Sequence, residues 1–185
     1  MVKETNTKSN VKKAEIKSKV EEIETETKDK VEEVRMDEKV SVSSIAPWIT
    51  GFARIITIGD VSIPPNGTVR LSREEVLAQG QSNNKLITGI DGVGSHATLY
   101  IEDAWLREEL GFDTDETRQQ VLTKELVKTI FEKKAMPQFK EEIEENVVTR
   151  AEKFSLLSMI KMLKINDYNK IAFCEEHCGA KLNAQ

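Results

Sequence analysis

Three residues near the end of the chain have side chains that can bind a metal ion. Cys174, His177 and Cys178 are spaced at i, i+3 and i+4, so on a helix they share one side. Structural zinc needs four such ligands, commonly as two separated pairs, and the only other histidine, His96, lies far away in a glycine-rich segment. We therefore interpret the three as an apolar helix face in which cysteine acts as a small hydrophobe, with zinc as the alternative. We expect no metal and no cofactor.

The segment Asp91-Gly92-Val93-Gly94-Ser95-His96 could serve phosphate binding or catalysis. Its glycines allow an exposed backbone that can cradle an anion, but a strand, not the required helix start, is predicted to follow. A serine and a histidine adjacent in sequence cannot form the hydrogen bond between nucleophile and base. We predict a hairpin loop that reaches a protein partner, with Gly92, Gly94 and His96 as candidate contact residues.

Basic residues within or beside the predicted strands suggest a second kind of function, nucleic-acid binding; they are Arg54, Arg70, Arg73 and Lys85. Exposed aromatic side chains usually accompany such residues, and the local candidates, Phe52 and Tyr100, occupy positions suited to a core. The net charge of -5 also disfavours general binding to phosphate backbones. The sequence therefore predicts a protein that is not an enzyme and has no small-molecule substrate, with nucleic-acid binding as the alternative function.

The elements that would position these residues change character near Glu102. Before it, strands are predicted at 40–45, 55–58, 68–71, 85–90 and 97–101, separated by glycine, proline and asparagine turns. This pattern is typical of an antiparallel sheet or a partly open barrel. A Ser72-x-x-Glu75 capping box predicts one short helix among the strands, ending at Gly80.

After Glu102 the apolar residues follow a helical period. The first predicted helix covers 103–110, and an Asp113-x-x-Glu116 capping box opens the second. The third has Pro137 in its first turn, and Thr149-x-x-Glu152 caps the fourth. The last helix starts at Asn166 or Asp167 and ends at Gly179. In the helix after Thr149 we expect an inward face of Phe154, Leu157, Ile160 and Leu163. The class is α+β: a charged arm over 1–40, a β-rich module over 41–103, a helical subdomain over 104–180 and a tail over 181–185.

The arm, residues 1–40, contains 10 Lys/Arg and 11 Asp/Glu and no glycine, proline or aromatic residue. An apolar seam at heptad spacing runs through it, formed by Ile16, Val20, Ile23 and Val34, although Thr27 and Lys30 occupy intervening seam positions. Such a stripe does not sustain an isolated helix. Two interpretations stay open: a solvated, partly disordered tail, or a coiled-coil helix that orders on a partner or on another copy of the chain. On the second, residues 1–36 are mobile in the free protein and helical in the assembly.

Length and composition set the remaining limits. The 185 residues provide one ordinary domain plus an extension, with 38% hydrophobic, 32% charged and 5% aromatic residues. No run approaches the roughly 20 apolar residues of a membrane-spanning helix, and the first residues do not resemble a signal peptide. We therefore expect a soluble protein without a membrane partner, made in a cytoplasm.

Residues 42 to 180 resemble small virion proteins of tailed bacteriophages that infect Gram-positive hosts. Five segments carry the resemblance: Pro47 to Phe52, Arg70 to Val76, Gln81 to Leu86, Gly92 to Ala97 and Val148 to Lys153. The resemblance implies a structural component of a head, a head-tail connector or a tail. Its partners would be other virion proteins and copies of itself in a symmetric assembly. It would be located in the virion, and in the host cytoplasm during assembly.

Overall fold

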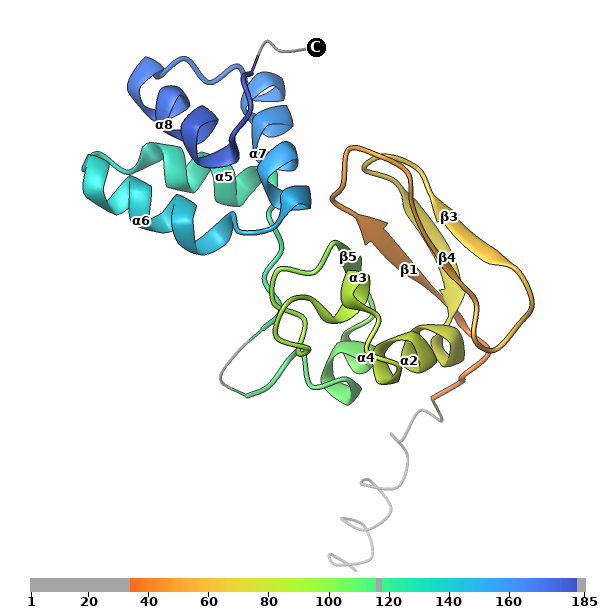
Figure 1. Cartoon of the computed structure of the whole chain (residues 1–185). Coiled ribbons are helices and arrows are strands. Elements are labelled where there is room, and N and C mark those ends of the chain that lie inside the picture. The colour runs from red at the N-terminus through yellow and green to blue at the C-terminus, as the bar shows by residue number, and fades with distance from the viewer. Residues whose placement is uncertain (1–33, 116–117, 183–185) are drawn as a thin grey trace, which may run out of the picture. The chain divides into compact units, whose positions relative to one another are not determined.

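The computed structural model describes residues 34–115 and 118–182 of the chain (Figure 1). The chain divides into two units, Met1–Arg35 and Met36–Gln185, and the fold described below is that of the second unit. The seam residues Ile16, Val20 and Ile23 lie outside the described residues. Val34, the last residue of the seam, is 38% exposed.

The first sheet has three antiparallel strands in the order β4-β1-β5. The central strand is β1 (Lys39–Ser44), flanked by β4 (Thr68–Ser72) and β5 (Leu99–Ile101). Burial alternates along β1, so that every second side chain faces the interior, as the period of a half-buried strand requires. The prediction of a first strand at 40–45 is confirmed.

A two-stranded antiparallel sheet, β2 (Thr50–Ala53) and β3 (Asp60–Ile63), completes the strands of the described chain. Three helices complete this part of the fold: α2 (Arg73–Gln81), α3 (Lys85–Thr88) and α4 (Ala104–Glu109). The two sheets and these helices enclose the first core, whose buried members are Val40, Val42, Val61, Ile63, Leu71, Val76, Ile87, Leu99, Ile101, Leu106 and Phe112.

Four helices follow and enclose a second core: α5 (Lys124–Glu132), α6 (Met136–Asn146), α7 (Arg150–Met162) and α8 (Tyr168–Cys178). Several predicted ends are confirmed. Pro137 stands in the first turn of α6, Thr149 and Glu152 form the complete capping box of α7, and Asp167 caps α8, which ends at Gly179 in the left-handed conformation. The protein is thus α+β, with antiparallel sheets preceding a group of helices, as the sequence predicts.

No helix within residues 34–115 and 118–182 is long and apolar enough to cross a membrane.

Two predicted strands are wrong. Ile55 to Ile58 lie in the loop between β2 and β3, because the hairpin closes earlier through a hydrogen bond from Arg54 N to Gly59 O. Residues 85–90 contain helix α3 instead of a strand. Asn84 caps this helix, with its side chain accepting from Leu86 N, and Gly89 ends it with a φ of 71°. In both places local β propensity yields to backbone hydrogen bonding.

Two helix predictions also need correction. Helix α5 starts after Thr123, whose hydroxyl accepts from Leu126 N, and not after Asp113. Asp113 instead accepts from the Arg107 side chain and from Gln119 N, while Glu116 lies outside the described residues. On α7, Phe154 was expected to face inward but is 39% exposed, and its ring contacts Trp48 instead of the second core.

We predict that Gly89→Ala destabilises the protein far more than Gly111→Ala. Both glycines have a positive φ, 71° at Gly89 and 72° at Gly111, so an alanine is strained at either position. A Cβ at Gly89 would collide with the carbonyl oxygen of Ser95, whereas nothing lies within 4 Å at Gly111. Thermal unfolding should show a loss of about 1 kcal/mol for Gly111→Ala and at least about 2 kcal/mol more for Gly89→Ala. Equal losses would contradict the close packing of Gly89 on Ser95.

Candidate functional site

The loop joining β2 to β3 presents three isoleucines to solvent. We call residues 54–59 the isoleucine loop. Ile55 is 49% exposed, Ile56 is 43% exposed and Ile58 is fully exposed. Large aliphatic side chains gathered on one short loop are unusual at a free surface and typical of a contact with another protein.

A buried carboxylate holds this loop in place. Glu75, in the first turn of α2, is 1% exposed. Its Oε1 accepts a hydrogen bond of 2.9 Å from Ile55 N, and its Oε2 accepts one of 3.1 Å from Ile56 N. Each oxygen of one carboxylate therefore fixes one backbone N–H of the loop.

The side-chain amides of Gln79 and Asn84 extend this hydrogen bonding from the isoleucine loop to α3. Gln79, one turn after Glu75 on α2, is 3% exposed and donates from Nε2 to Glu75 Oε1 at 2.9 Å and to Ala53 O at 2.7 Å. Its Oε1 accepts from Asn84 Nδ2 at 2.8 Å. The chain of hydrogen bonds thus runs from the cap of α3 through α2 to the isoleucine loop, and we call Glu75, Gln79 and Asn84 the polar relay.

The polar relay keeps Glu75 ionised. Burial alone would raise the pKa of its carboxyl. Hydrogen bonds from Gln79 and from the N–H groups of Ile55 and Ile56, together with the positive charge of Arg54, outweigh burial and hold the pKa below its ordinary value. A buried charge is stable only where such partners compensate it, so Glu75 and the loop backbone fix each other.

Sequence reasoning identified Glu75 but gave it the wrong partner. We expected a reciprocal capping box with Ser72; Ser72 does cap α2 by accepting from Glu75 N, but the Glu75 carboxylate turns to the isoleucine loop. The helix also continues through Gly80 to Gln81. The spacing of four between Glu75 and Gln79 was an available signal that both lie on one helix face.

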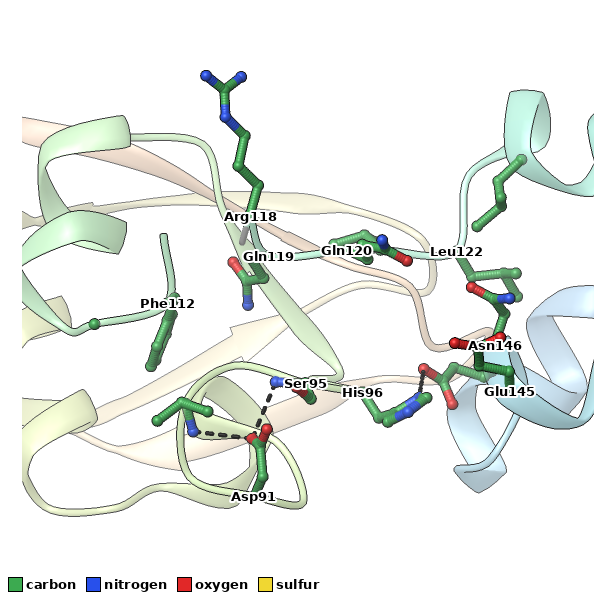
Figure 2. A pocket seen from close by; sticks show the side chains of 15 residues that line it. Asp91, Ser95, His96, Phe112, Arg118, Gln119, Gln120, Leu122, Glu145 and Asn146 are labelled. Atoms are coloured by element: carbon green, nitrogen blue, oxygen red, sulfur yellow. Dashed lines mark hydrogen bonds and ion pairs between the residues drawn. The ribbon is translucent and has the colours of Figure 1, made fainter. Parts of the chain in front are cut away.

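The predicted contact residues Gly92, Gly94 and His96 lie in a second loop, residues 91–96, which we call the glycine loop. It joins α3 to β5 and therefore is not a hairpin loop, contrary to our prediction. Asp91 Oδ1 accepts from Val93 N and Ser95 N, and both glycines have φ near 90°. These bonds fold the loop back on Asp91 (Figure 2).

His96 connects the glycine loop to the helices. Its Nδ1 lies 2.8 Å from Oε1 of Glu152 at the start of α7. The other oxygen of Glu152 accepts from Val148 N, Thr149 N and the Thr149 hydroxyl. The same carboxylate therefore caps α7 and bonds to the part of the chain that encloses the first core.

A cavity of about 530 Å³ lies beside this contact and is lined by both loop and helix residues (Figure 2). Asp91, His96, Glu145, Asn146 and Glu152 contribute polar groups to it. Ser95 N donates to Asp91, and His96 Nδ1 lies against Glu152. The hydrogen bond between His96 and Glu152 thus links the glycine loop to the start of α7.

A second contact supports α7 at the same end. The rings of Trp48 and Phe154 meet edge to face with centroids 5.9 Å apart. The Arg150 guanidinium lies 5.4 Å from the Trp48 ring and 5.7 Å from the Phe154 ring. Such cation and ring contacts add to the burial of the aromatic surface.

The three residues considered for zinc are placed on α8. Cys174 is fully buried in the second core, and burial raises the pKa of its thiol to about 12. His177 Nε2 lies 2.6 Å from Val147 O, and its ring stacks on Phe173. Over the described parts of the chain, no group of three or more His, Cys, Asp or Glu side chains is arranged to hold a metal ion.

The basic residues of the nucleic-acid alternative are partly engaged within the fold. Arg73 forms ion pairs with Glu38 at 2.6 Å and with Asp103 at 2.9 Å. Arg70 donates to the Lys39 carbonyl. Lys85 is the first residue of α3. The positive charge of Arg54 helps to lower the pKa of Glu75.

Comparison with models of known protein families, with curated proteins and with solved structures finds no match to this chain.

We predict that Glu75→Gln destabilises the protein by about 1–3 kcal/mol at pH 7, because one loop N–H then faces an amide N–H₂ group. The folded-state pKa of Glu75 is depressed, so its contribution is present above the ordinary value of 4.5 and is lost as the pH falls below that value. Denaturant unfolding of both proteins from pH 7 to pH 3 should show the difference shrinking. The exposed neighbour Glu74 provides the control, Glu74→Gln. A loss independent of pH would contradict an ionised Glu75.

We predict that His96 and Glu152 are energetically coupled. A double-mutant cycle of His96→Ala and Glu152→Gln should give a coupling free energy of about 1 kcal/mol by denaturant unfolding. Glu145 lines the same cavity, so a parallel cycle of His96→Ala with Glu145→Gln should be additive. Equal coupling in both cycles would mean that the cavity's general charge, and not the His96 contact, is responsible.

Proposed function

We propose that this chain is a non-enzymatic structural component of a bacteriophage virion that acts through contacts with other virion proteins and with copies of itself. The observation that carries the proposal is the isoleucine loop. This loop carries three exposed isoleucines, and the buried, ionised carboxylate of Glu75 accepts hydrogen bonds from the backbone N–H groups of Ile55 and Ile56. Fixing an exposed apolar loop lowers the conformational entropy lost when a partner covers it.

The placement of the other candidate residues is consistent with this function. The Glu152 carboxylate, with its four short hydrogen bonds, serves to position α7 and the glycine loop. The resemblance of residues 42 to 180 to small virion proteins of tailed phages supplies the kind of assembly. In this proposal the protein is made in the host cytoplasm and resides in the head, the connector or the tail.

The proposal predicts that the protein is present in purified particles of the phage that encodes it. Quantitative mass spectrometry of particles banded by density should detect its peptides at a constant ratio to the major capsid protein. A fixed ratio is expected because each symmetric position binds one copy. Particles treated with protease before disruption control for adhering host protein. Absence from mature particles combined with presence in precursor shells would instead indicate an assembly scaffold, and absence from both would refute the proposal.

A further inference from the structure

The hairpin formed by β2 and β3 has a buried face and an exposed face, because successive residues of a strand point to opposite sides. Two directly paired sets make up the exposed face, Gly51 with Ser62 and Ala53 with Asp60. Gly51, Ala53 and Ser62 are small, so a second sheet can approach this face closely. The isoleucine loop joins β2 to β3 and extends this face at one end.

The base of the isoleucine loop carries one charge of each sign. Arg54 is the first residue of the loop, and Asp60 is the first residue of β3. The pairing of Ala53 with Asp60 and the hydrogen bond from Arg54 N to Gly59 O bring the two to neighbouring positions. Within residues 34–115 and 118–182 neither side chain forms an ion pair, although the charge of Arg54 helps to lower the pKa of Glu75.

This exposed face is complementary to itself. When two copies face each other about a two-fold axis parallel to the strands, β2 of each copy lies over β3 of the other. Arg54 of each copy then lies opposite Asp60 of the other, so two pairs of opposite charges form in one contact. The same axis sets one isoleucine loop against the other, which removes exposed aliphatic side chains of both copies from water.

We propose that the exposed face of the β2–β3 hairpin, together with the isoleucine loop, packs about a two-fold axis on the same face of a second copy of this chain. Arg54 of each copy pairs with Asp60 of the other. The inference rests on the proposed function in taking copies of this chain as partners, and it names the surface through which they meet. One hairpin offers fewer residues than the roughly 20–30 that each partner contributes to a standard interface, so free chains associate weakly.

The test is self-association of the full chain, measured by sedimentation velocity from about 10 μM to about 1 mM, the range suited to a small interface. Asp60→Lys sets two positive charges opposite each other in both halves of the contact and should weaken association by at least about tenfold. Its control is Glu141→Lys, which changes the net charge equally at an exposed position of α6. The control should leave association unchanged.

A charge swap between two chains identifies the partner of Asp60. Arg54→Asp alone should also weaken self-association, because two negative charges then face each other. A mixture of the Arg54→Asp and Asp60→Lys chains should form heterodimers with nearly wild-type affinity, since each half of the contact again joins opposite charges. The melting temperature of each variant is measured first, because Arg54 also acts on Glu75. If Arg54→Asp unfolds the chain, Asp60→Lys and its control still decide.

The apolar part of the contact is tested in the same assay. Ile58 is fully exposed, so Ile58→Ser leaves the packing of the fold unchanged. It should weaken association by at least about tenfold, because a two-fold contact loses the side chain twice. The control is Ile90→Ser, the same substitution at a position that is 55% exposed just after α3, and it should have no effect.

Several results would overturn the inference. They are a wild-type chain that stays monomeric throughout, an Asp60→Lys chain that associates as well as Glu141→Lys, and a mixture of two folded charge variants that stays monomeric. These outcomes are independent of the particle analysis. Self-association without incorporation would reject the virion role and keep the surface, whereas incorporation of a monomeric chain would reject the surface and keep the role.

Discussion

The buried charge of Glu75 is the constraint on which the first half of the structure depends. A carboxylate that is 1% exposed has to be matched by donors, and here they come from three directions: Ile55 N, Ile56 N and the Gln79 amide. Because Gln79 also holds Ala53 O and Asn84, the same requirement fixes the end of β2 and the cap of α3. Glu75 and its partner Gln79 thus connect the end of β2, helix α2, the cap of α3 and the isoleucine loop.

The same short motif gives two different results in this chain. Ser72-x-x-Glu75 and Thr149-x-x-Glu152 both read as capping boxes, and only the second is complete. Glu152 returns to the backbone of Thr149 and still has an oxygen for His96. Ser72 is also the last residue of β4 and pairs with Lys39 of β1, and the carboxylate of Glu75 is directed to the isoleucine loop instead. The residue that caps each helix can therefore be predicted from the local sequence. The direction of the glutamate side chain depends instead on which segment of the fold packs against it.

The carboxylates of Glu152 and Glu75 also fix different parts of the fold. Glu152 acts inside the molecule, where it joins the start of α7 to the glycine loop through His96. Glu75 is buried beneath the isoleucine loop and bonds the backbone N–H groups of Ile55 and Ile56, whose side chains are exposed. Exposed apolar groups on a fixed backbone lower the cost of association, and this property connects the fold to the proposed role in an assembly.

The sequence by itself determined the α+β class, the change of period near Glu102 and the helix ends at Ser72, Asp103, Thr149 and Gly179. Each of these features depends on residues three or four positions apart, so it can be predicted from a short stretch of sequence. Only the tertiary structure decided the loop conformation of Ile55 to Ile58, the partner of Glu75 and the contact of His96 with Glu152. Those partners lie 19 to 56 residues away in sequence, and side-chain hydrogen bonds over such separations leave no periodic signal in the chain.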